Sequence, residues 1–223
     1  ARKCGEWRLL LNSSVVSSAD HTMNLCPFLA ASLAITLASV ALAQEAKPLL
    51  HDHVLPVLAT PDFKTPLDSS FSIAKGKWTP EGGVLSVLDL PEQKHIPVLH
   101  HKVGLSSATI EVEFLIEGPG SFLVGCDSSK HVGRVVVGAA GLSIAEDSVV
   151  PSHTIAKLPM TVKAGEWHKL RVEWQGDQMA ANLDGQELKA QHPYFATPKA
   201  RSWLAAGKSV KVRNLKISGE AKP

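Results

Sequence analysis

Cysteine is scarce in this chain. The 223 residues include three cysteines, Cys4, Cys26 and Cys126, and we expect the first two to be removed with an N-terminal leader. A single remaining cysteine cannot close an internal disulfide, so the fold must be stabilised by its core. Cys126 ends an apolar run that starts at Phe122, which favours a buried, inert thiol over a nucleophile.

Clusters of Lys and Arg with interleaved aromatic residues are absent after residue 43, and the formal net charge of the whole chain is +2. Proteins that bind nucleic acid carry such basic clusters because they neutralise phosphates. We therefore expect no nucleic-acid partner.

The histidines lack the spacing of metal ligands. His51 and His53 lie in a proline-containing segment, and His100 and His101 are adjacent on an expected strand, where neighbouring side chains point to opposite faces. A zinc site needs three or four converging ligands, so we predict no metal site and no cofactor. No G-x-S-x-G motif is present, which argues against the nucleophile elbow of a serine hydrolase.

No charged residue occurs between Leu25 and Ala43, and this apolar run ends in Ala41-Leu42-Ala43. Small residues at these two alanine positions are typical of signal-peptidase cleavage. We expect residues 1–22 to be an unstructured upstream read-through and residues 23–43, starting at Met23, to be a signal peptide. The protein would then be exported to the periplasm, the cell envelope or the exterior, with no stable membrane span after cleavage. An uncleaved anchor is the alternative, because about nineteen apolar residues can just cross a bilayer.

No amphipathic helix of four turns is apparent after residue 44. Residues 44–66 contain four prolines and little periodicity, which indicates a spacer. Residues 67–223 read as one domain of many short strands separated by turns, which is typical of an all-β sandwich or barrel of antiparallel sheets. The expected strands are residues 71–73, 76–79, 84–88, 98–102, 108–117, 121–126, 133–137, 142–145, 160–162, 167–175, 178–183, 186–190, 202–204 and 209–219.

The clearest strand is residues 167–175. His168, Leu170, Val172 and Trp174 alternate there with polar residues, so Trp174 should point into the core. Asp184-Gly185 then supplies a hairpin turn, since both central positions of a type I′ turn need positive φ.

The last strand contains two apolar pairs of opposite parity. Val210 and Val212 would face one side of a regular strand, and Leu215 and Ile217 the other. Burying both pairs requires a shift of register, so we predict a β-bulge at Arg213-Asn214.

Glu111 and Glu113 project from the polar face of the strand at residues 108–117. Two carboxylates on one sheet face can cleave a glycoside, one as acid and one as nucleophile or base. They can equally form a solvated face, with Lys169 and Arg171 opposite them on a neighbouring strand. Both interpretations stay open.

Two aromatic residues are candidates for a sugar-stacking platform. Trp203 and Tyr194 lie outside the strongest core pattern, and aromatic rings can stack on a sugar ring. Tyr194 belongs to the expected loop His192-Pro193-Tyr194-Phe195, and the alternative is that this loop covers an edge of the sandwich.

Taken in order, several motifs resemble the 3-keto-disaccharide hydrolase family of exported bacterial proteins. They are W-x-x-x-G-G-V-L (residues 78–85), V-E-F (residues 112–114), G-E-W-H-K-L-R-V (residues 165–172), N-L-D-G (residues 182–185) and V-x-V-R-N-L-x-I (residues 210–217). The resemblance covers roughly residues 68–219. It implies a concanavalin-like jelly-roll β-sandwich, as in laminin-G-like domains and family 16 glycoside hydrolases, with a sugar-facing concave sheet.

Three positions match the family's motifs, namely Glu113, Arg213 and Asn214. Other motif positions depart from it: Leu115 replaces an arginine, residues 118–122 replace an N-S-G segment, and residues 203–207 lack the polar groups of an L-Q-x-H-G segment. These losses remove groups that would polarise a glycosidic oxygen.

The resemblance implies glycoside hydrolysis, with Glu113 as acid or base and Arg213 orienting substrate oxygens. Glu111, Asn214, Trp203 and Tyr194 would then contact a saccharide. The alternative is a non-catalytic jelly-roll module of the cell envelope that binds a glycan or another surface ligand. A structural envelope domain without a ligand is a third hypothesis. The saccharide and the oligomeric state do not follow from the sequence.

Overall fold

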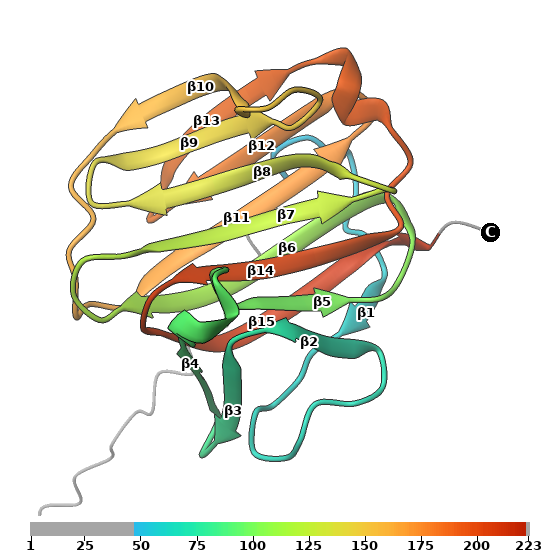
Figure 1. Cartoon of the computed structure of the whole chain (residues 1–223). Coiled ribbons are helices and arrows are strands. Elements are labelled where there is room, and N and C mark those ends of the chain that lie inside the picture. The colour runs from blue at the N-terminus through green and yellow to red at the C-terminus, as the bar shows by residue number, and fades with distance from the viewer. Residues whose placement is uncertain (1–46, 222–223) are drawn as a thin grey trace, which may run out of the picture. The chain divides into compact units, whose positions relative to one another are not determined.

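The computed structural model describes residues 47–221, and these form two antiparallel sheets packed face to face (Figure 1). The seven-stranded sheet has the order β10 (His153–Pro159), β9 (Gly141–Glu146), β8 (His131–Gly138), β7 (Ser121–Asp127), β14 (Arg201–Gly207), β5 (Val98–His101) and β2 (Phe71–Lys75). This confirms the predicted all-β jelly-roll class.

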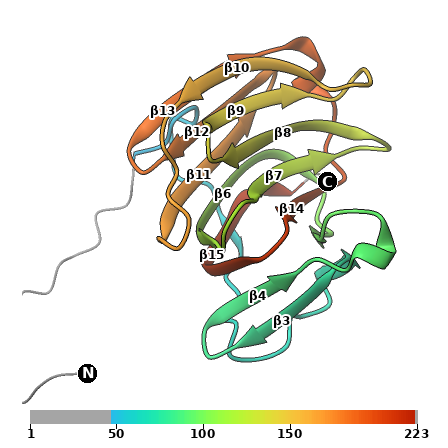
Figure 2. The ribbon, with the colours of Figure 1, turned by 60° about the vertical axis from the view of Figure 1, so that its left-hand side comes forward.

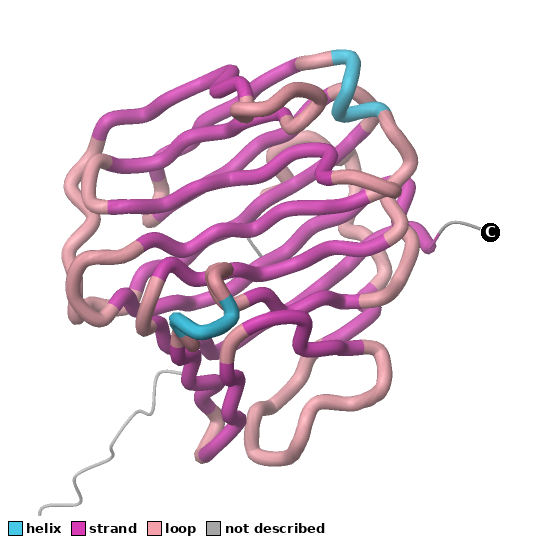
Figure 3. Tube along the Cα trace, viewed as in Figure 1, coloured by secondary structure: helices cyan, strands magenta, loops and turns pink. Residues whose placement is uncertain are grey.

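The second sheet has eight strands. Its order is β13 (Gln186–Gln191), β12 (Gln178–Leu183), β11 (His168–Gln175), β6 (Leu105–Ile116), β15 (Val210–Ala221), β4 (Val84–Leu88) and β3 (Lys77–Glu81), and β1 (Val57–Ala59) also pairs with β15. The β3–β4 hairpin extends below the rest of the sandwich (Figure 2). Among the described residues the helical segments are two short 3-10 turns, η1 (Pro91–Gln93) and η2 (Pro193–Ala196) (Figure 3).

The core lies between the two sheets. Phe114 of β6 stacks on Phe122 of β7, with ring centroids 4.6 Å apart, and so joins the two layers directly. As predicted, His168, Leu170, Val172 and Trp174 of β11 all point into this core and are buried. Aromatic side chains bury large apolar areas, so these contacts stabilise the sandwich strongly.

The predicted bulge in β15 is confirmed. The register of β15 against β6 shifts between Arg213 and Lys216, and Asn214 takes a positive φ of 51°. Asn tolerates this left-handed conformation better than most residues. The shift lets Val212 and Leu215 both face the core.

The prediction of a spacer at residues 44–66 is wrong for residues 47–66, which the structure describes. β1 pairs with β15, Phe63 is buried in the core, and Leu55 is buried against the outer face of the eight-stranded sheet. Isolated apolar residues between prolines give no periodic signal, which is why the sequence pattern missed this packing. We call residues 47–55 the N-terminal strap, because they cross the outer face of the eight-stranded sheet.

The expected strand at residues 160–162 is also wrong. The strand lies earlier, as β10, and pairs with β9 at the edge of the seven-stranded sheet. An edge strand has one free side, so it accepts the terminal Pro159 and exposes much of its surface, which weakens the alternating pattern.

The predicted read-through (residues 1–22) and signal peptide (residues 23–43) lie outside the described residues. Neither of the described 3-10 turns is long and apolar enough to cross a bilayer.

Candidate functional site

The predicted site residues Glu111, Glu113, Arg213 and Asn214 meet on the outer face of the eight-stranded sheet. Glu113 lies between Arg213 of β15 and Lys169 of β11 in the strand register, and Glu111 pairs with Arg171 in the next row. Basic and acidic side chains therefore alternate across neighbouring strands. Opposite charges facing each other across strands stabilise a sheet.

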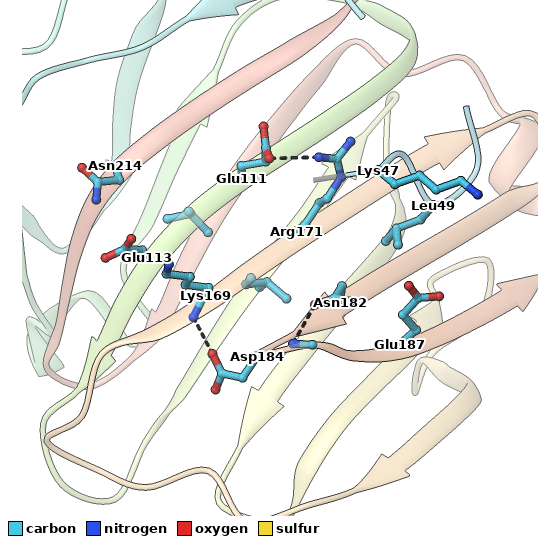
Figure 4. A pocket seen from close by; sticks show the side chains of 13 residues that line it. Lys47, Leu49, Glu111, Glu113, Lys169, Arg171, Asn182, Asp184, Glu187 and Asn214 are labelled. Carbon is cyan, nitrogen blue, oxygen red and sulfur yellow. Dashed lines mark hydrogen bonds and ion pairs between the residues drawn. The ribbon is translucent and has the colours of Figure 1, made fainter. Parts of the chain in front are cut away.

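Each of these carboxylates is already bonded to a cation. Arg213 Nε donates to Glu113 Oε2 over 2.7 Å, and Arg171 Nη1 donates to Glu111 Oε1 over 2.9 Å (Figure 4 shows the second bond). Lys216 Nζ also lies 3.5 Å from Glu111 Oε2. The cross-strand ion pairs expected for a solvated face are present, and the catalytic role of these carboxylates stays a prediction.

Electrostatics disfavour Glu113 as a proton donor. Partial burial alone would raise the pKa of Glu113, but hydrogen bonds from Arg213 and Asn214 outweigh it and hold the pKa below its usual value. A glycosidase acid needs the opposite shift, because it must carry a proton near neutral pH. The guanidinium of Arg213 is also packed against the ring of Trp167, 4.0 Å from the centroid. Glu113 and Arg213 thus join β6 to β15 at the bulge.

A pocket of about 550 Å³ adjoins these residues, between the N-terminal strap and strands β6, β11 and β12 (Figure 4). Lys47 and Leu49 of the strap line one end of the pocket, and Glu113 and Asn214 lie at the other end (Figure 4).

The strap is held by a buried carboxylate. Glu173 of β11 is fully buried and accepts hydrogen bonds from the backbone N–H groups of Leu49 and Leu50 and from Arg171 Nε, at 2.6 to 3.0 Å. Burial alone would raise the pKa of Glu173, but these donors lower it.

Trp203 and Tyr194 do not join the Glu113 group. Trp203 belongs to β14 in the other sheet, and Tyr194 lies in η2, partly buried against the core. Trp203 is only 5% exposed, so it is not the free platform that we expected. Its indole lies against β7 at Gly125, where a Cβ atom would collide with the ring.

The outer face of the seven-stranded sheet carries two adjoining hollows. The first, of about 400 Å³, has an apolar floor that includes Leu123, Val136, Trp203 and Ala205. The second, of about 750 Å³, lies against polar side chains of β7, β8 and β14 and against the β9–β10 loop. His131 and Arg134 line both hollows. We call the pair of hollows the cross-strand groove.

Asp127 organises the centre of this groove. Its carboxylate accepts hydrogen bonds from Trp203 Nε1 at 2.6 Å, Arg201 Nε at 2.9 Å and His131 Nδ1 at 2.7 Å. Burial alone would raise the pKa of Asp127, but these donors lower it. In return, the hydrogen bond to Asp127 raises the pKa of His131.

A second buried carboxylate lies beside the first. Asp147 accepts a hydrogen bond from Arg134 Nη1 at 2.6 Å and another from Ser152. Its other oxygen, Oδ2, is buried and has no hydrogen-bond partner among residues 47–221.

Sequence reasoning missed Asp127, His131, Arg134 and Arg201. The available signal was Gly125 inside the expected strand at residues 121–126, since a glycine in a strand interior often marks close approach of another group. Within the described residues, no three His, Cys, Asp or Glu side chains are grouped as metal ligands would be.

No protein-family model matches the sequence, and no curated protein matches it either. Solved structures do resemble the fold. The carbohydrate binding module CBM66 from Bacillus subtilis is 14% identical, with a TM-score of 0.58, over 67% of this chain and 96% of that one. The Bacillus licheniformis β-glucanase is 11% identical, with a TM-score of 0.56, over 74% and 98%.

A protein of unknown function with a galectin-like fold from Bacillus subtilis is 9% identical, with a TM-score of 0.55, over 77% of this chain and 99% of that one. At these identities the likeness establishes the jelly-roll fold. Membership in the 3-keto-disaccharide hydrolase family stays a prediction.

Proposed function

We propose that this protein is an exported, non-catalytic saccharide-binding module whose site is the cross-strand groove. The observation that carries the proposal is the groove's composition: an apolar floor continues into a set of polar side chains that their own hydrogen bonds hold in place. Binding sites for small molecules typically combine apolar lining with a few well-positioned polar groups.

A sugar ring matches this arrangement chemically. Its C–H faces are apolar, and its hydroxyl groups lie around the rim. Leu123, Val136 and Ala205 can contact a ring face, while Arg134 and His131 at the junction of the hollows can bond to hydroxyl oxygens. Two adjoining hollows also offer room for more than one sugar unit.

The solved structures of similar fold support a glycan ligand. Their descriptions include a carbohydrate binding module and a β-glucanase. A shared fold does not carry function by itself, so the argument rests on the groove.

Binding is favoured over hydrolysis because the candidate carboxylates are occupied. Asp127 is buried beneath its three donors, and Glu113 is ion-paired on the opposite sheet, each with a lowered pKa. Neither is suited to protonate a leaving group.

A blocking substitution tests the proposal. Val136→Trp should fill the apolar hollow and weaken saccharide binding at least about tenfold, measured by glycan array followed by calorimetry. Leu115→Trp is the matched control, since Leu115 lies partly exposed on the outer face of the eight-stranded sheet. The proposal fails if no saccharide binds, or if the two variants lose affinity equally.

Hydrolysis remains testable in the same preparations. Turnover of 3-keto-glucosides that disappears in Glu113→Gln would replace this proposal with the hydrolase hypothesis. For export, N-terminal sequencing of the protein from its source cells should find Gln44 first, and a start far upstream would refute cleavage after Ala43.

A further inference from the structure

In the cross-strand groove the carboxylates lie deeper than the positively charged side chains. The side chains of Asp127 and Asp147 are only 2% and 5% exposed, whereas those of His131 and Arg201 are 57% and 42% exposed. The carboxylates thus lie beneath the surface and the nitrogen-bearing groups lie on it.

The buried carboxylates are engaged by the protein itself. Asp127 accepts three hydrogen bonds, and Asp147 accepts bonds from Arg134 and Ser152. The negative charge of these carboxylates is therefore balanced by donors of the protein. A ligand in the groove contacts the exposed nitrogen atoms of the arginine and histidine side chains.

The cations keep bonding capacity after these contacts. Arg201 contacts Asp127 through Nε, and no contact of its terminal nitrogens with another residue of 47–221 is seen. A guanidinium can donate five hydrogen bonds in a planar fork that matches a carboxylate or a sulfate. Lys130 adds an exposed ammonium group to the same hollow.

We infer that the cross-strand groove selects an acidic saccharide chain, one that bears carboxylate or sulfate groups. This inference rests on the proposed function and names the class of glycan. The anionic groups of the chain would meet Lys130, Arg134 and Arg201, while the sugar rings lie on the apolar floor.

The pocket on the eight-stranded sheet gives a contrasting surface. Glu111 and Glu113 are part of its lining and are partly exposed there, at 29% and 17%. Lys47, Lys169 and Arg171 line the same pocket, so an acidic glycan would meet carboxylates and cations together there, and the charge pattern does not favour that ligand.

The test compares glycans that differ in charge. Binding of the intact protein to polygalacturonate, alginate and dextran sulfate is measured by calorimetry beside neutral dextran and laminarin. We expect acidic chains to bind at least about tenfold more tightly at low salt, and the difference to shrink as salt screens it. Comparing the carboxylated glycans, polygalacturonate and alginate, with the sulfated glycan, dextran sulfate, shows which acidic group binds more tightly.

Two substitutions locate the effect. Lys130→Gln should lower affinity for the acidic chains about threefold to tenfold and leave neutral binding unchanged. Arg201→Gln should lower affinity for the acidic chains by a similar factor and affinity for the neutral chains less, because Arg201 also holds Asp127 in place. Lys130 is the safer variant for folding, since its side chain has no bonded partner among residues 47–221. Lys211→Gln removes one positive charge from the opposite sheet and should change neither affinity.

The outcomes separate the two proposals. Neutral and acidic chains binding equally would overturn the acidic preference and leave saccharide binding in place. Tight acidic binding that neither groove variant weakens would also overturn it, because the anion would then bind elsewhere. Absence of binding to every glycan would overturn both.

Discussion

The two outer faces of the sandwich carry similar charged side chains in different arrangements. On the eight-stranded sheet, Glu111 and Glu113 are partly exposed and face cations across neighbouring strands. On the seven-stranded sheet, Asp127 and Asp147 are buried beneath His131, Arg134 and Arg201. The first pattern follows from strand register and stabilises the sheet. The second leaves cations at the surface around an apolar floor, as a binding site would.

The largest expected effect concerns the structural face. Glu173→Ala should lower the free energy of unfolding by about 3 kcal/mol, because it leaves Arg171 and the strap N–H groups without their buried acceptor. Urea denaturation measures this loss. Glu187→Ala, an exposed change on β13, should cost under about 0.5 kcal/mol. Equal losses would mean that the strap contributes nothing.

The same carboxylate should make the fold sensitive to acid. The folded-state pKa of Glu173 is lowered, so its contribution is present above the ordinary pKa and is lost as pH falls through the folded value. Stability should therefore fall below about pH 4 in the native protein and much less in Glu173→Ala.

Asp127→Asn should be the next largest change and should affect the binding face. It keeps the side-chain size and removes the charge, which should cost about 2 kcal/mol of stability. It should also lower the pKa of His131, because the partner that raises it is lost. NMR titration of His131 in both proteins measures the shift. An unchanged pKa would show that Asp127 does not control His131.

Binding of acidic saccharides should depend modestly on pH. His131 faces Asp127, Asp147, Arg134 and the rings of Trp203 and His100, and its raised pKa keeps it protonated above its ordinary range. Affinity should therefore fall about threefold as pH rises through that pKa, above the ordinary histidine value of 6.5. His131→Gln should abolish the dependence, and its persistence in that variant would assign it to another group.

The smallest effect should come from the residues that the sequence favoured most. Glu113→Gln should change stability by under about 1 kcal/mol and leave saccharide affinity unchanged, because Glu113 and Arg213 form a partly exposed pair on the face opposite the groove. A large loss of binding would return the site to the eight-stranded sheet.

Local pattern predicted the fold better than it predicted the site. The period of two placed Trp174 in the core, and the parity conflict in the last strand located the bulge at Arg213-Asn214. Both features depend on residues that are close together in the sequence, so the sequence alone is enough to predict them.

The groove depends on neighbours in space. His131 reaches Asp127 through the β7–β8 hairpin, but Arg201 and Trp203 reach it only because β14 pairs with β7, about 75 residues away along the chain. No local pattern records that second pairing. The strap was missed for the same reason, since Leu49 and Leu50 contact Glu173, more than 120 residues away. Glu113 and Arg213, which the family resemblance singled out, contact each other across β6 and β15, and their catalytic role stays a prediction.

The most direct test of a saccharide site in the cross-strand groove is backbone NMR during titration with an acidic oligosaccharide. Shifts should concentrate at Leu123, Val136 and Ala205 and at His131, with little change around Glu111 and Glu113. Shifts confined to the eight-stranded face, or no shifts at saturating oligosaccharide, would contradict it.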